Sequence, residues 1–412
     1  MRAALVRWHR WFGLAAAAFL FVAGLTGAVI SWDHELDAWL NPQFYRAPGA
    51  GAARPALELA RTVEAADPRV RVSYLPLHTH TGEAVLMSVV PRMMIGSGRL
   101  SVLDFNQVAV DPVNGQVLAR RLWGAVSLSR ENVLPFLYKL HYSMHLPDAG
   151  PVRIGILFMG IIGLLWVIDC LAALLLSFPT RSAWRKSFGF RWRRGGAALT
   201  YDTHRSGGVW IWLALLIIAV TSVGMNLEDE IMRPVVARFS TLTASPTELI
   251  EPQAIERAPE PGIDAAQAVQ MAQADARRRG WRTPPGGLFY SPEYSLYGVG
   301  FFHAGSEHGD GGLGNAWLYL DASSGRILTA TQPGAGSAGD VFMQAQFPLH
   351  SGRIAGLPGR IFVSVLGLAV AGLSATGVYL WMRKQRRRHR ARTNGFAPES
   401  AIDAGPADAA LH

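Results

Sequence analysis

The chain has 412 residues, of which 50% are hydrophobic and 17% are charged, and its mean hydropathy is slightly positive. This composition favours a membrane protein over a water-soluble one. The net charge of +9 comes with no nucleic-acid-binding motif, so nucleic acid is not an expected partner. The single cysteine, Cys170, excludes disulfides, iron–sulfur clusters and covalent haem attachment.

Four apolar runs are long enough to cross a bilayer core of roughly 30 Å, which needs about 20 helical residues. The first run is too long for the apolar region of a signal peptide and lacks a small-x-small cleavage site, so we expect it to be retained. The four runs lie near residues 12–32, 152–178, 207–226 and 357–382.

Basic residues set the expected orientation, because basic loops stay in the cytoplasm. The N-terminus, residues 181–196 and residues 383–392 are all strongly basic. They lie on one side of the membrane if all four runs cross it, so both termini are expected in the cytoplasm. The two long connections then lie outside, which is the periplasm if the chain comes from a Gram-negative bacterium.

The predicted fold class is therefore an α-helical membrane protein with four transmembrane helices and two periplasmic α+β domains. The predicted segments are the N-terminus with helix one (1–32), outer domain one (33–140), helix two (141–178), a basic cytoplasmic loop (179–203), helix three (204–226), outer domain two (227–349), helix four (350–382) and a basic, disordered cytoplasmic tail (383–412).

The two halves of the sequence repeat each other. His9-Arg10 and His204-Arg205 open the first and third apolar runs. VAVDPVNGQVL (108–118) and LYLDASSGRIL (318–328) both predict strand, turn, strand. Leu-His pairs ending in His141 and His350 each precede a glycine by nine residues. Such a parallel duplication predicts a pseudo-twofold axis along the membrane normal.

The repeat sorts the histidines into equivalent pairs. Residues related by a twofold axis can face each other, and a haem iron takes two imidazole nitrogens from opposite faces, each about 2.0 Å away. We therefore expect His9 with His204 at an inner haem and His141 with His350 at an outer haem. His145, one helical turn after His141, is an alternative ligand; the two cannot clamp one haem between them if they share a helix face.

Other interpretations of these histidines remain. Each histidine could be a hydrated side chain at the membrane interface. The spacing of His141 and His145 also fits zinc, but Tyr142-Ser143-Met144 offers no third ligand. Asp169 is the one carboxylate deep in an apolar run and is either functional or internally hydrogen-bonded. His78 and His80 could bind a metal through alternate strand positions, but solvated loop positions are expected for both of them and for His34, His303 and His308. His389 belongs to the basic tail.

Several of these motifs together resemble the PepSY-associated transmembrane proteins. They are HRWFGLAAAAFLFVAGLTGAVISW (9–32), the turn DPVNGQVL, the two Leu-His pairs and Asp202-x-His204-Arg205, and the resemblance extends to about Arg390. It implies that the outer modules are PepSY domains. It also implies two non-covalent b-type haems between four helices, with His9, His141, His204 and His350 as ligands.

The resemblance further implies a ferric-siderophore reductase of the bacterial inner membrane. A cytoplasmic or quinol donor would supply electrons, and a ferric siderophore or another periplasmic acceptor would receive them. No nicotinamide or flavin motif is visible, so the donor is expected to be a separate molecule. The rival hypothesis is a haem-free accessory protein whose outer domains bind a protease, a peptide or a transporter component.

Overall fold

A computed structural model describes residues 1–94, 99–150, 152–178, 180, 184–257 and 260–394. Within this part of the chain, three helices are long and apolar enough to cross a membrane. They are α1 (Arg2–Ile30), α5 (Ile154–Ser177) and α14 (Gly356–Asn394). Helices α7 (Gly196–Trp210) and α8 (Trp212–Asn226) meet at a bend of 68° and form a fourth span if they are taken together.

The helix boundaries differ from the predicted ones near two histidines. His141 does not open the second long helix: it lies near the end of a separate helix, α4 (Val133–Ser143). The chain breaks there because Met144 and His145 both adopt left-handed backbone angles (φ 51° and 52°) and Pro147 follows. His350 likewise ends a short helix, α13 (Gln346–His350), ahead of α14.

The third and fourth helices also extend beyond the predicted segments. Helix α7 begins at Gly196, eight residues before the predicted start at His204. Residues 383–394 continue helix α14 and are not the disordered tail that we predicted. Arginine and lysine are good helix formers, so a basic stretch can extend a helix without an apolar face. Residues 395–412 lie outside the described part of the chain.

The outer regions share one antiparallel sheet of eight strands, so the two predicted α+β segments are structurally continuous. The strand order is β4-β3-β2-β1-β5-β6-β7-β8, and the halves join where Tyr74 of β1 lies opposite Phe289 of β5. The strands are β1 (Val70–Pro76), β2 (Val85–Pro91), β3 (Gln107–Val110), β4 (Val117–Arg121), β5 (Pro285–Ser291), β6 (Leu296–Phe301), β7 (Ala316–Asp321) and β8 (Ile327–Thr331).

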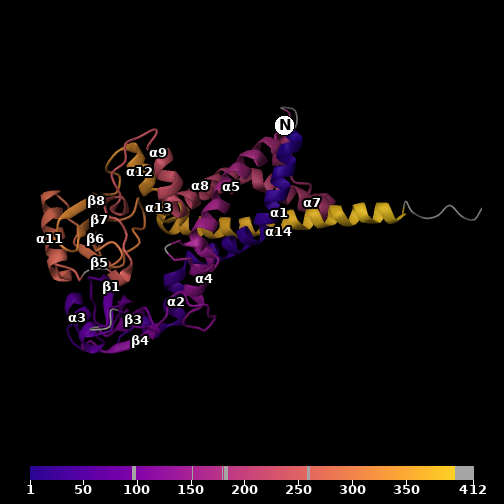
Figure 1. Cartoon of the computed structure of the whole chain (residues 1–412). Helices are drawn as coiled ribbons and strands as arrows, with labels where there is room; N and C mark the ends of the chain where they lie inside the picture. The colour runs from indigo at the N-terminus through magenta and orange to yellow at the C-terminus, as the bar shows by residue number, and fades with distance from the viewer. Residues whose placement is uncertain (95–98, 151, 179, 181–183, 258–259, 395–412) are drawn as a thin grey trace, which may run out of the picture.

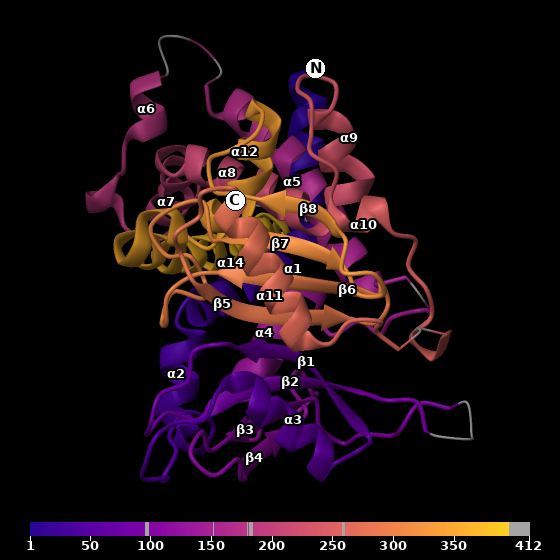
Figure 2. The ribbon, with the colours of Figure 1, turned by 90° about the vertical axis from the view of Figure 1, so that its left-hand side faces the viewer.

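Both halves of the sheet are built alike. The expected strand–turn–strand units are the β3–β4 and β7–β8 hairpins, with Gly115 and Gly325 at positive φ (76° and 75°) in the turns. Helices α3 (Ala56–Ala66) and α11 (Ala265–Arg278) cover the face of the sheet that points away from the long helices (Figures 1 and 2). The sheet thus presents its other face and its loops toward the membrane-spanning part.

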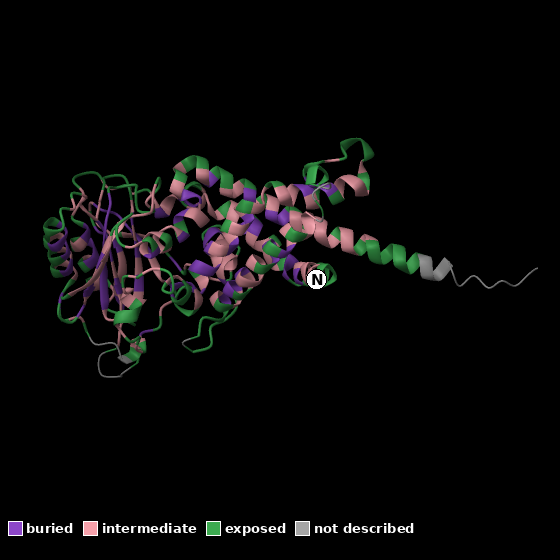
Figure 3. Cartoon of the chain, turned by 90° about the horizontal axis from the view of Figure 1, so that it is seen from above, coloured by how far each residue is buried: buried purple, intermediate pink, exposed green. Residues whose placement is uncertain are grey.

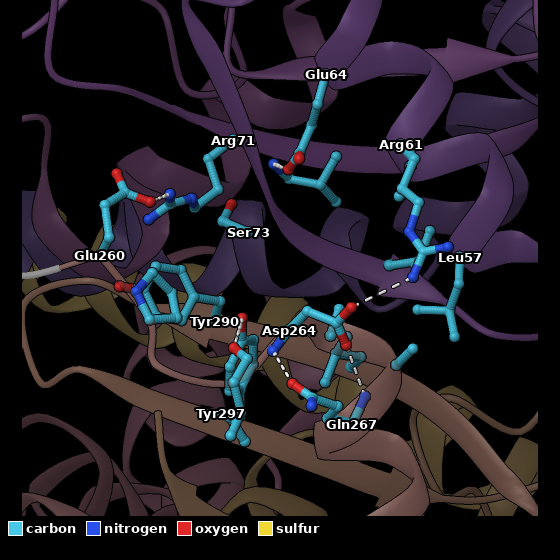
Figure 4. A pocket seen from close by; sticks show the side chains of 18 of the residues that line it. Leu57, Arg61, Glu64, Arg71, Ser73, Glu260, Asp264, Gln267, Tyr290 and Tyr297 are labelled. Carbon is cyan, nitrogen blue, oxygen red and sulfur yellow. Dashed lines mark hydrogen bonds and ion pairs between the residues drawn. The ribbon is translucent and has the colours of Figure 1, made fainter. Parts of the chain in front are cut away.

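Between α3 and α11, over the junction of the halves, lies a cavity of about 400 Å³ (Figure 4). Arg61 of α3 contacts Asp264, the N-cap of α11, at 3.3 Å, and Arg71 of β1 pairs with Glu260. Burial raises the pKa of Tyr297, at the floor of this cavity, to about 12. Ion pairs as well as strand pairing therefore join the two halves.

Much of the surface of the long helices is exposed or of intermediate burial, whereas the strands of the sheet are largely buried (Figure 3). Leu171 and Leu175 of α5 and Phe362, Val365 and Leu368 of α14 are exposed. Outward apolar surface of this kind suits contact with lipid. The N-terminus and the basic end of α14 lie at the end of the molecule away from the sheet (Figure 1).

Short elements connect these parts. They are α2 (Asp33–Leu40), η1 (Pro42–Phe44), α6 (Trp184–Phe188), η3 (Trp192–Arg194), the π turn η4 (Glu228–Met232), α9 (Arg233–Val236), α10 (Pro246–Leu249), η5 (Ile255–Arg257), α12 (Ala338–Gln344) and η6 (Arg353–Ala355).

Candidate functional site

Four histidines from the two halves meet in two pairs. His9 of α1 and His204 of α7 have ring centres 6.2 Å apart, with 46° between the ring planes. His141 of α4 and His350 of α13 have ring centres 6.1 Å apart, with 65° between the planes. The structure thus brings together the same two pairs that the internal repeat selects.

The ring separations match those of two imidazoles on one metal ion. A metal–imidazole bond is about 2.0 Å long, and an imidazole nitrogen lies roughly 1.1 Å from its ring centre, so axial partners have centres about 6.2 Å apart. Directly stacked rings would lie closer together. The ring separations of both pairs are therefore compatible with one metal ion held between two imidazoles.

Hydrogen bonds orient the outer pair. Nδ1 of His141 lies 3.0 Å from the Ala23 carbonyl oxygen and 3.1 Å from Thr26 Oγ1. Nδ1 of His350 lies 3.0 Å from Thr221 Oγ1. Both threonine hydroxyls donate to carbonyls one helical turn earlier, so their oxygens accept from the imidazoles.

In the inner pair, His204 contacts a carbonyl and a threonine hydroxyl, as His141 does, whereas His9 contacts a carboxylate. Nδ1 of His204 lies 3.0 Å from the Leu373 carbonyl oxygen and 3.1 Å from Thr376 Oγ1. Nδ1 of His9 lies 3.0 and 2.9 Å from the two carboxylate oxygens of Asp169. Asp169 is buried, with 7% of its surface exposed.

These contacts define one tautomer at all four histidines. Carbonyl and carboxylate oxygens only accept, so Nδ1 carries the proton at His9, His141 and His204, and the threonine contact does the same at His350. Nε2 then carries the lone pair. Metal-binding histidines are oriented in this way, with the second nitrogen donating to a carboxylate or a carbonyl.

Glycines let the neighbouring helices approach the imidazoles. A Cβ at Gly27 of α1 would lie 2.9 Å from His141 Cε1, and one at Gly377 of α14 would lie 3.1 Å from His204 Cε1. Where α1 crosses α14, a Cβ at Gly24 would come within 2.5 Å of the Gly367 carbonyl oxygen. The absence of these side chains therefore allows α1 to pack closely against α14 and lets both imidazoles lie directly against a helix backbone.

A largely apolar cavity of about 340 Å³ surrounds the outer pair. His141 and His350 line it together with residues of α1, α5, α8 and α14, among them Gly27, Gly163 and Trp166. Among the described residues, no group of three or more His, Cys, Asp or Glu side chains gathers to hold a metal ion. Two imidazoles and an apolar slot fit a haem, which supplies its own four nitrogen ligands.

His145 is turned away to another partner. It follows helix α4, its ring stacks on Phe136 with centres 4.5 Å apart, and its Nε2 lies 2.9 Å from the Phe136 carbonyl oxygen. His141 and His145 therefore do not share a helix face. His141, and not His145, is the residue that faces His350.

The remaining predicted positions lie apart from the pairs. His78 contacts the Phe302 carbonyl oxygen at 3.0 Å, and His34 packs edge-on against Tyr45. His308 is exposed, as predicted, and it also lines the outer cavity. His80 and His303 lie outside the regular strands, and His389 lies in the basic end of α14.

Sequence reasoning missed the three threonines. Thr26 lies seventeen residues after His9, and Thr221 lies seventeen residues after His204. Each threonine contacts the outer histidine of its own half, His141 or His350. Thr376 of α14 lies within hydrogen-bond distance of His204. The repeated spacing between histidine and threonine was the signal that could have found the first two.

A second, larger cavity of about 1100 Å³ adjoins the outer one, with Met225, Asn226 and His308 among the residues that line both. It lies among η4, α13 and strands β7 and β8. Its lining combines aromatic side chains with carboxylates: Trp281, Trp317, Tyr319, Glu228, Asp229, Glu230 and Glu307. Burial and then the nearby Asp229 raise the pKa of Glu228.

Comparison with known protein families indicates that the chain is a membrane protein. The family model described as the PepSY-associated TM region matches residues 6–384, which includes both histidine pairs and the whole sheet. A comparison with curated proteins finds no significant match. The chain is a multi-pass membrane protein that belongs to the PepSY-associated transmembrane family.

Proposed function

We propose that the protein is a di-haem membrane protein that passes electrons across a bacterial inner membrane. The observation that carries the proposal is the pair of imidazole couples, with ring centres 6.2 and 6.1 Å apart and Nδ1 committed to acceptors. His9 and His204 would hold one haem b, and His141 and His350 the other. Haem iron bound in this way supplies one-electron redox chemistry.

The two couples lie near opposite faces of the membrane. His9 and Thr26, the hydrogen-bond partner of His141, are seventeen residues apart on α1, which corresponds to roughly 25 Å of helix. The bilayer core is roughly 30 Å thick. The apolar helices between the couples exclude water and hold the two sites at a constant separation.

Basic residues support the orientation in which electrons leave at the sheet side. Arg2, Arg7 and Arg10 and the basic end of α14 lie at the end of the molecule remote from the sheet (Figure 1). The positive-inside rule assigns that end to the cytoplasm and the sheet to the periplasm. The donor is then a cytoplasmic reductase or a quinol, and the acceptor is periplasmic.

The large cavity beside the outer couple is the proposed place of the acceptor, most simply a ferric siderophore. Its aromatic walls and carboxylates suit a bulky iron complex, and it shares Asn226 and His308 with the cavity around the outer histidines. Reduction to Fe(II) weakens binding by hard oxygen ligands and releases the metal. Electron delivery at this position would therefore serve iron uptake.

Proteoliposomes test this function. The protein is reconstituted with a membrane-impermeant reductant sealed inside, a ferric hydroxamate outside, and an external Fe(II) chelator that reports reduced iron. We expect external Fe(II) to form only with the protein present, and formation to fall at least tenfold in His350→Ala. Equal rates with the wild type, the variant and empty liposomes would refute the proposal.

The visible spectrum separates this function from its rival. A haem-free accessory protein would purify as a folded chain with no reducible b-type Soret and α bands. The proposed function requires both bands.

A further inference from the structure

Each of four helices provides a side-chain hydrogen-bond partner for one of the four histidines. Three of these partners are threonines and the fourth is an aspartate. Thr26 of α1, Thr221 of α8 and Thr376 of α14 meet the Nδ1 atoms of His141, His350 and His204. On α5 the corresponding partner of His9 is Asp169. Three of the imidazoles are therefore oriented by neutral groups, which are threonine hydroxyls and, at His141 and His204, also backbone carbonyls, whereas His9 is oriented by a carboxylate.

The carboxylate of Asp169 lies in a buried, apolar environment, where a charge is energetically unfavourable. Asp169 lies within an apolar helix and is 7% exposed, and both of its oxygens lie within 3.0 Å of His9 Nδ1. An ionisable side chain at such depth is expensive and usually functional. A threonine at this position would orient the imidazole, as the other three do, without that cost.

A carboxylate changes the ligand in a way that a hydroxyl does not. Charge-assisted hydrogen bonds are roughly twice as strong as neutral ones, so Asp169 draws the Nδ1 proton of His9 more strongly than a threonine would. The imidazole gains anionic character, and Nε2 becomes a stronger donor. A stronger donor and a nearby negative charge both favour Fe(III) over Fe(II), which lowers the reduction potential.

We propose that Asp169 is a positioning residue that holds the reduction potential of the inner haem site below that of the outer one. The inference rests on the proposed function and adds the direction of electron transfer. One electron that a quinol or a reductase delivers at the His9 and His204 couple then moves to the His141 and His350 couple with a favourable free energy. Reverse flow from the periplasm is disfavoured by the same difference.

Spectroelectrochemical titration of the purified holoprotein tests the proposal. His9→Ala, which retains only the outer haem, assigns the two midpoint potentials. We expect the lower potential to belong to the inner site, and Asp169→Asn and Asp169→Thr to shift it upward while the outer potential stays unchanged. Thr26→Asp is the matched control, and it should lower the outer potential alone.

Two outcomes would overturn the proposal. One is an inner potential that is unchanged in both Asp169 variants with two haems still bound. The other is loss of the inner haem in the near-isosteric Asp169→Asn, which would show that the carboxylate retains the haem and does not tune it. Absence of haem from the wild-type protein would instead refute the proposed function itself.

Discussion

The inner and outer histidine pairs have nearly the same ring separation but are held in different ways. His9 and His204 lie on α1 and α7, within the apolar spans or continuous with them. His141 and His350 lie on the short helices α4 and α13, which follow strands β4 and β8 along the chain. The inner pair is therefore a property of the helical bundle alone, whereas the outer pair also depends on the sheet.

Removal of single histidines should have the largest effect and should separate the pairs. His204→Ala removes one ligand of the inner couple, so we expect haem content to fall from two to one per chain with the outer site intact. His350→Ala should leave only the inner haem. The pyridine haemochromogen assay on purified variants measures both. Loss of both haems from a folded variant would contradict the independence of the pairs.

Glycine substitution should disturb one pair at a time without touching a ligand. A Cβ at Gly27 lies 2.9 Å from His141 Cε1, so Gly27→Val should displace that imidazole and lower the occupancy of the outer haem several-fold. Gly377→Val should do the same at the inner site. Gly372 on α14 is exposed and has nothing beyond its own helix backbone within 4 Å of its Cβ position, so it provides the control variant Gly372→Val. Equal haem loss in all three variants would contradict this explanation.

A buried ion pair in the sheet region should affect only the outer pair. Arg121 of β4 contacts Asp37 of α2 at 2.8 Å, and their side chains are 3% and 6% exposed. Arg121→Met leaves Asp37 buried without its cation, at a cost of about 3–5 kcal/mol. We expect thermal unfolding in detergent at a lower temperature, with outer haem lost before inner haem. Simultaneous loss of both haems would show that the sheet supports both sites.

The smallest expected effect is a pH dependence of the folding stability that comes from Glu248, in the second half of the outer region. The hydrogen bonds from Arg233 lower the pKa of Glu248. Its contribution to stability is therefore fully present above the unfolded pKa, about 4.3, and is lost as the pH falls through the lower folded value. The free energies of unfolding of the wild type and of Glu248→Gln should be measured across this pH range, and they should become equal at its acid end. A constant difference would assign the effect to another group.

The histidine pairing could be predicted because the duplication places equivalent residues around an axis, and His9 and His204 share the same local motif. The chain break after His141 and the separate position of His145 could not be predicted, because residues other than glycine seldom adopt the positive φ that Met144 and His145 have. The β1–β5 junction is a long-range pairing without a local signal. The helical residues 383–394 were missed because they lack apolar periodicity.

Each histidine pair is proposed to bind one haem through both imidazoles. Haem content and electron paramagnetic resonance of the purified wild-type protein test this binding. We expect two b-type haems per chain, both low-spin with bis-imidazole signatures. A folded protein that contains no haem, or one whose haem is high-spin with a single imidazole ligand, would contradict it.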